Sequence, residues 1–99
     1  MTETMAGLQE FLKALASETR QKIFFKVFTN GGEHTVSEVA EIMGLGQSTA
    51  SEQLAILKRA GLLQSRKEGK EVYYRPDSRQ ILGLLKELTE QISRCCPPQ

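Results

Sequence analysis

Apolar residues in the first part of the chain recur with the spacing of amphipathic helices. The first stripe has the i, i+3, i+4, i+7 spacing, predicts a helix over about residues 5–16, and comprises Leu8, Phe11, Leu12 and Leu15. The second stripe lies between a capping Ser17 and the helix-stopping Asn30-Gly31-Gly32, and comprises Ile23, Phe24, Val27 and Phe28. Two helices are therefore predicted before the first glycine pair.

The next segment predicts two helices joined by a tight turn. Thr35-Val36-Ser37-Glu38 has the form of a capping box and starts a short third helix, which is expected to bury Val39, Ile42 and Met43. After the turn Gly44-Leu45-Gly46, a fourth helix runs from about Gln47 to Ala60. Its inward face would be Ala50, Leu54 and Leu57, and Gly61 is placed as its C-terminal stop.

Beyond Gly61 the hydrophobic period changes from 3.6 to 2. Alternation within residues 62–75, with Glu68-Gly69 between the two runs, predicts a β-hairpin with a basic tip. Pro76 ends the hairpin, and a last helix is expected over about residues 78–95. Its coiled-coil-like seam, spaced 4, 3 and 4, comprises Ile81, Leu85, Leu88 and Ile92. The alternative is a helix that packs on its own core, a role that Leu82 and Leu84 could fill.

Composition limits the class of protein. At 99 residues, with 39% hydrophobic and 25% charged residues, the chain is expected to be one globular domain spanning 1–99. It has no apolar run long enough to cross a membrane, and its polar start, with Glu3, is unlike a signal peptide, so a cytoplasmic protein without a membrane partner is expected. The net charge is only +1, but residues 47–75 hold six basic and three acidic residues.

The two central helices and the hairpin together indicate binding to double-stranded DNA. Small polar side chains begin the fourth helix, where they can reach base edges, and cations on the fourth helix and the hairpin can contact phosphates. The candidate DNA-binding residues are Gln47, Ser48, Thr49, Ser51, Gln53, Lys58, Arg66, Lys67 and Lys70. Each feature alone is an ordinary cap or solvated turn, but their order is typical of a DNA reader.

These segments resemble the ArsR/SmtB family of bacterial winged-helix repressors. The matching segments, over about residues 8–94, are Ala14–Arg20 with Ile23, Val36–Ala40 with Gly44–Leu54, Leu57–Leu63 and Arg66–Tyr74. The resemblance implies a mainly α (α+β) winged helix-turn-helix fold in the order α-α-α-α-β-β-α. Its helix-turn-helix would span about residues 35–60 and its wing about residues 62–75. One departure is Glu52-Gln53, where the family commonly has histidines; Glu52 would repel phosphates, so it either points away or reads a cytosine.

The resemblance also implies a homodimer formed by the first and last helices, about residues 5–16 and 78–95. The expected interface residues are Leu8, Phe11, Leu12, Ile81, Leu85, Leu88 and Ile92. Such a dimer would repress transcription by binding an imperfect inverted repeat, and an inducer would release it. No cofactor is expected.

The family's metal positions are not filled by metal ligands in this sequence. Thr35-Val36-Ser37-Glu38 has no thiol where metal-sensing relatives carry one. The positions that match the zinc ligands of the last helix are Ser78, Gln80, Gln91 and Arg94, which do not suit a cation. No metal site is therefore predicted, and His34 is expected to be a surface residue.

Cys95 and Cys96 are the remaining candidates for sensing. Their thiols could bind a metalloid or be oxidised, and because adjacent cysteines bridge each other only with strain, a bridge to a second copy is an alternative. They lie three and four residues after Ile92, so they could equally extend the apolar seam as small hydrophobic residues.

Other functions remain open at this point. A repressor without an inducer fits the packing role of the cysteines, and a winged-helix module that binds another protein fits the low net charge. An enzyme is not expected, because the sequence offers no nucleophile–base pair, phosphate loop or dense acidic cluster.

Overall fold

The structure, a computed structural model, describes residues 2–98. Its elements in chain order are α1 (Thr2–Leu15), α2 (Glu18–Ile23), the π-helical continuation η1 (Phe24–Phe28), β1 (His34–Thr35), α3 (Val36–Met43), α4 (Gln47–Arg59), β2 (Leu63–Glu68), β3 (Glu71–Pro76) and α5 (Ser78–Cys95). The predicted winged helix-turn-helix architecture is confirmed. The short strand β1 was not predicted.

Local side-chain chemistry sets the ends of the central helices. Ser17 caps α2 by accepting a hydrogen bond from the backbone N–H of Arg20 at 3.3 Å. The predicted capping box of α3 is present, because the Thr35 hydroxyl accepts from the Glu38 N–H at 3.2 Å and the Glu38 carboxylate accepts from the Thr35 N–H at 2.8 Å. Gly61 follows α4 with a φ of 88°, a left-handed conformation that favours glycine.

The wing belongs to a three-stranded antiparallel sheet in the order β1-β3-β2. In the centre of β3, Tyr74 lies opposite His34 on one side and Ser65 on the other. Strand β1 therefore joins the residues just before α3 to the centre of β3 in the hairpin.

One core joins α1, η1, α3, α4 and the base of the hairpin. The four residues of the second predicted stripe are all buried, as are Val39, Ala50, Leu54 and Leu57. Two expectations were wrong. Ile42 is 56% exposed, because the two-turn α3 packs through one narrow face, and Leu82 is 65% exposed while Leu84 alone of that pair is buried.

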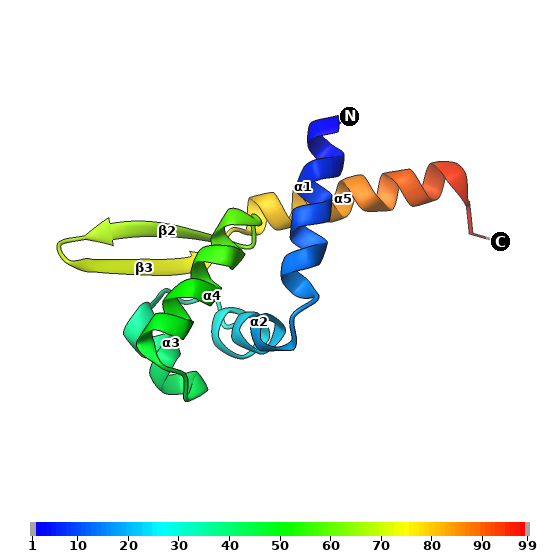
Figure 1. Cartoon of the computed structure of the whole chain (residues 1–99). Coiled ribbons are helices and arrows are strands. Elements are labelled where there is room, and N and C mark those ends of the chain that lie inside the picture. Colours follow the sequence, from blue (N-terminus) through cyan, green and yellow to red (C-terminus); the bar gives the residue numbers. More distant parts are fainter. Residues whose placement is uncertain (1, 99) are drawn as a thin grey trace.

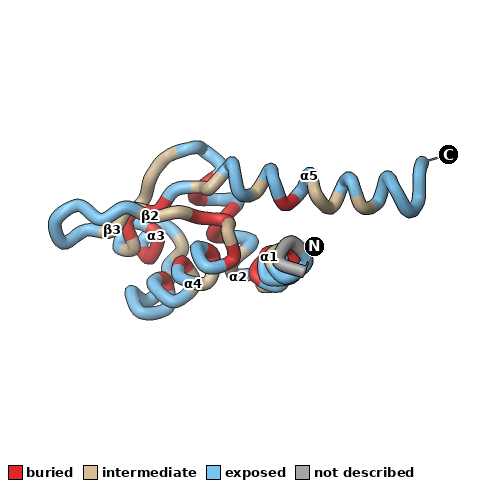
Figure 2. The backbone as a smooth tube through the Cα atoms, turned by 90° about the horizontal axis from the view of Figure 1, so that it is seen from above, coloured by how far each residue is buried: buried red, intermediate tan, exposed pale blue. Residues whose placement is uncertain are grey.

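The outline of the molecule is elongated, with extents of 48 × 25 × 23 Å. The hairpin projects at one end and α5 at the other, and α1 crosses the first half of α5 (Figure 1). The second half of α5 has little of the chain around it and is mostly exposed, as Figure 2 shows. Within residues 2–98, no helix is long and apolar enough to cross a membrane.

The burial of the first apolar stripe, on α1, differs from the sequence expectation. Leu8 and Phe11 are only 4% and 3% exposed, because they pack into the chain's own core, whereas Leu12 is 49% exposed. The expected role of Leu8 and Phe11 in a dimer interface is therefore corrected to a role in the core of one protomer. Leu12 is the residue of this set that α1 presents to solvent.

Candidate nucleic-acid interface

The first turn of α4 presents a row of polar side chains to solvent. Gln47, Ser48, Thr49 and Ser51 are all exposed, while Ala50 between them is buried against the core. The N-cap is Gly46, so no side chain there occupies the first backbone N–H groups of the helix. The turn therefore offers hydroxyl, amide and backbone donors to one partner surface.

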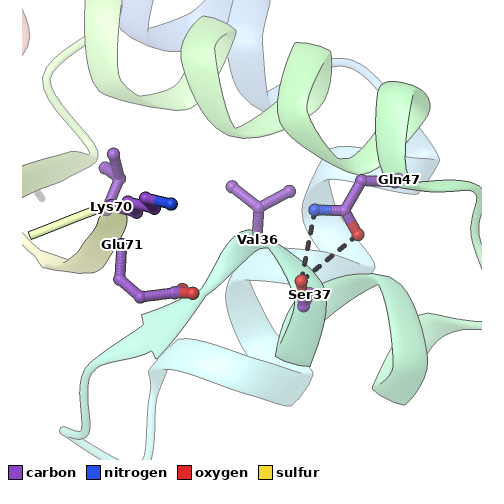
Figure 3. Close-up of a pocket in the computed structure, with 6 residues that line it drawn as sticks. Val36, Ser37, Gln47, Lys70 and Glu71 are labelled. Atoms are coloured by element: carbon purple, nitrogen blue, oxygen red, sulfur yellow. Dashed lines mark hydrogen bonds between the residues drawn. The ribbon is translucent and has the colours of Figure 1, made fainter.

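Gln47 is held at the junction of α3 and α4. Its side-chain amide donates to the Ser37 hydroxyl at 3.2 Å, and that hydroxyl also lies 3.4 Å from the amide oxygen (Figure 3). The pair borders a hollow of about 180 Å³ between the two helices and the tip of the wing, lined by Val36, Ser37, Gln47, Lys70, Glu71 and Val72. Lys70 and Gln47 reach this hollow from opposite sides, so the wing tip and the start of α4 share one surface.

Gln53 lies on a different side of α4 from the exposed row. It is half-buried, and its amide oxygen accepts a hydrogen bond from Nη1 of Arg20 at 3.0 Å. The Nε–H of the same guanidinium donates to the Ala14 carbonyl oxygen at 2.8 Å. Arg20 thus connects the end of α1 to the middle of α4, and the oxygen of Gln53 is already engaged within the chain.

The cations of the interface fall into two groups. Lys58, Lys67, Lys70 and Arg66 are all exposed. Arg66 differs in being bound to Glu33, with Nε–Oε2 and Nη2–Oε1 distances of 2.9 and 3.0 Å, and to Glu68. The Arg66 hydrogen bond holds the pKa of Glu33 below its usual value, and the two carboxylates raise the pKa of Arg66.

The Arg66–Glu33 contact was not anticipated from the sequence. The two residues are 33 positions apart, and opposite charge is the only sequence signal that links them. The structure thus places the predicted phosphate-binding lysines in solvent and the predicted phosphate-binding arginine within an ion-pair network.

The remaining candidates lie away from this surface. Cys95 and Cys96 are bridged to each other at the end of α5, and both residues are exposed. His34, expected on the surface, is half-buried with its ring edge-on to Phe28 at 5.5 Å. Among the described residues, no three histidine, cysteine or acidic side chains are grouped to hold a metal ion.

The sequence of this chain is similar to those of known bacterial regulatory proteins. A family model described as bacterial regulatory protein, arsR family, matches residues 17–65. The chain is 34% identical over 88 residues to the transcriptional activator HlyU of Vibrio cholerae, covering 89% of this chain and 80% of HlyU. The chain belongs to the ArsR family. The matched region includes the helix-turn-helix formed by α3 and α4.

Further relatives support the same assignment. The ArsR-family chain is 41% identical over 75 residues to a cadmium resistance transcriptional regulatory protein CadC homologue from Staphylococcus aureus; the match covers 76% of the chain and 61% of the homologue. The solved structure of reduced HlyU is 33% identical, with a TM-score of 0.66, covering 97% of this chain and 96% of that one. A homodimeric winged helix-turn-helix DNA-binding domain from Mycobacterium bovis is 25% identical, with a TM-score of 0.72, covering 99% and 90% of the two chains.

Proposed function

We propose that this ArsR-family chain is a sequence-specific regulator that binds double-stranded DNA as a homodimer. The observation that carries the proposal is the exposed polar row at the start of α4, flanked by the free lysines of the wing tip. Such a row fits the major groove, where hydroxyl and amide groups can read base edges, while Lys67 and Lys70 contact the phosphates beside it. Lys58, also exposed, adds a third phosphate contact.

The geometry of Gln47 and Gln53 refines which residues read bases. Because the Gln47 side chain is paired with Ser37 where α3 meets α4, it is suited to contact a DNA phosphate or the first base of the site. Ser48, Thr49 and Ser51 are the central readers of the row. Gln53 contributes to DNA binding indirectly, by holding α4 in position, since its amide oxygen accepts a hydrogen bond from Arg20.

The proposed dimer uses the exposed apolar side chains of α1 and α5. Leu12, Leu85 and Ile92 are 49%, 42% and 52% exposed, so α1 and α5 both offer large apolar side chains to a partner. Ile81 and Leu88 are half-buried against the core, and their spacing of 4, 3 and 4 with Leu85 and Ile92 places all four on one side of α5. The homodimeric relative from Mycobacterium bovis supports the pairing of two copies.

The direction of regulation is proposed to be repression that an inducer relieves. Exposed Cys95 and Cys96 lie three and four residues after Ile92, at the end of α5, so a change at the two sulfurs would act near the end of the proposed interface. A thiol-directed inducer, a metalloid or an oxidant, is therefore the one we propose.

The test is a fluorescence-anisotropy titration with DNA from immediately upstream of the protein's own gene. The reduced protein is titrated first, then again with arsenite, zinc or a mild oxidant, beside a Cys95→Ser/Cys96→Ser control. The proposal expects tight, salt-sensitive binding that one additive releases in the natural chain and not in the control. If no additive changed the affinity for DNA, thiol sensing would be contradicted and DNA recognition would stand. Absence of binding at low salt would contradict DNA recognition and favour a protein-binding module.

A further inference from the structure

The Arg66 side chain crosses the central strand of the sheet and reaches the residue just before β1. It starts on β2, and its guanidinium lies 4.6 Å from the centroid of the Tyr73 ring on the central strand β3. Beyond that ring it reaches Glu33, the residue just before β1 on the far edge. One arginine therefore joins the wing to the loop that precedes the helix-turn-helix.

The register of the hairpin separates Arg66 from the wing lysine beside it. Arg66 lies opposite Tyr73, and Lys67 lies opposite Val72. Since successive side chains on a strand point to opposite faces, Lys67 is on the face of Val72, which lines the hollow next to α4, and Arg66 is on the other face. Arg66 thus combines a position away from α4 with a charge that two carboxylates already neutralise.

Most exposed ion pairs stabilise a protein little, but the geometry here is of the kind that contributes more. The guanidinium makes two near-parallel bonds to one carboxylate, a third bond to Glu68, and a stacking contact with an aromatic ring. The Glu33 side chain is only 31% exposed. Such a fork is pre-organised, and lysine cannot reproduce it.

We propose that Arg66 and Glu33 are positioning residues that fix the inclination of the wing, so that Lys67 and Lys70 reach the DNA backbone, and that Arg66 is not itself a phosphate contact. This inference rests on the proposed function. Removing the negative charge of Glu33 should therefore weaken DNA binding, whereas a count of charges alone predicts stronger binding to a polyanion.

The first experiment measures operator affinity by anisotropy for Glu33→Gln and for Glu41→Gln. Glu41 is the control, because it is an exposed carboxylate on α3, outside the lining of the hollow, and the same charge is lost. We expect Glu33→Gln to bind about fivefold more weakly, the scale of a good surface ion pair, and Glu41→Gln to bind as tightly as the natural chain or more tightly. If Glu33→Gln bound as tightly as Glu41→Gln, the inference would be wrong.

A second pair of variants separates positioning from phosphate contact. Arg66→Lys keeps the charge but loses the fork and the ring stacking, whereas Arg66→Gln loses all three. The inference expects the two variants to lose affinity for DNA to nearly the same extent. Combined with Glu33→Gln, neither substitution should lower the affinity further. Full retention of affinity by Arg66→Lys would instead assign Arg66 to the phosphates.

Hydrogen exchange of the wing amides in the absence of DNA gives an independent result. Glu33→Gln should speed exchange in β2 and β3 about fivefold, with the helical core unchanged, and Glu41→Gln should not. Unchanged exchange would overturn the positioning role whatever the DNA result. If the natural chain bound no DNA, the proposed function would fail, and exchange alone would decide whether this ion pair orders the wing.

Discussion

Gln53→Ala tests whether Gln53 acts on DNA or on the position of α4. In the structure, this substitution removes the acceptor of a 3.0 Å hydrogen bond from the half-buried guanidinium of Arg20. A bond to a charged donor contributes about 1.5–3 kcal/mol when fully formed, and partial access of water lowers this, so a loss of about 1 kcal/mol of unfolding free energy is expected. For a domain of this size, that corresponds to a fall in Tm of about 4–8 °C.

The assay is thermal unfolding at one fixed protein concentration, because the stability of a dimer depends on concentration. Gln47→Ala is the matched control. It makes the same change at an exposed position of the same helix, where the partner is the exposed Ser37 hydroxyl, so a shift within about 0.5 kcal/mol is expected.

DNA binding by the two variants gives the opposite ranking. Gln47→Ala should weaken operator binding, whereas Gln53→Ala should leave the ratio of specific to nonspecific affinity within about twofold of the natural value. The reasoning would be refuted if Gln53→Ala kept the natural Tm and lost specific binding. That result would place Gln53 on the DNA.

Three further predictions follow from the surface of the molecule. Lys67→Gln with Lys70→Gln should lower the slope of log affinity against log salt by about 1.8, because about 0.9 is lost for each phosphate contact; an unchanged slope would remove the lysines from the interface. Leu85→Glu places a charge in the proposed dimer face, where the leucine is 42% exposed, and should raise the dimer dissociation constant at least about tenfold in sedimentation velocity. A dimer as tight as the natural one would show that the face lies elsewhere. Since bonding to Arg66 lowers the pKa of Glu33 in the folded chain, its contribution is complete above the ordinary value of 4.5 and is lost as pH falls below it through the folded pKa. An NMR titration of the wing amides should therefore show a midpoint below 4.5, and a midpoint at or above 4.5 would contradict the ion pair.

Features set by residues close in sequence were predictable. The stripe around Phe28, the capping box at Thr35 and the stop at Gly61 each depend on spacings of four residues or fewer, and the structure confirms them. The hairpin followed from alternation on either side of a glycine turn. Strand β1 is too short, at two residues, for alternation to reveal it.

Features that depend on distant segments were not predictable. The Arg20–Gln53 and Arg66–Glu33 contacts each join residues 33 positions apart, so only the packed chain brings them together. Ile42 matches a helical stripe, but the stripe cannot show how wide a face the neighbouring elements cover. The residue types of the candidate site were therefore predictable. The different roles of its exposed lysines and of the ion-paired Arg66 could be assigned only from the tertiary structure.

The most direct test of the central claim is a hydroxyl-radical footprint of the full chain on DNA from upstream of its own gene. A homodimer that inserts α4 into successive major grooves should protect two patches related by two-fold symmetry and about one helical turn apart. The same footprint should vanish for a variant that carries Ser48→Ala, Thr49→Ala and Ser51→Ala, with the fold preserved. Protection of a single patch, or no protection at a protein concentration that saturates nonspecific DNA, would contradict the account.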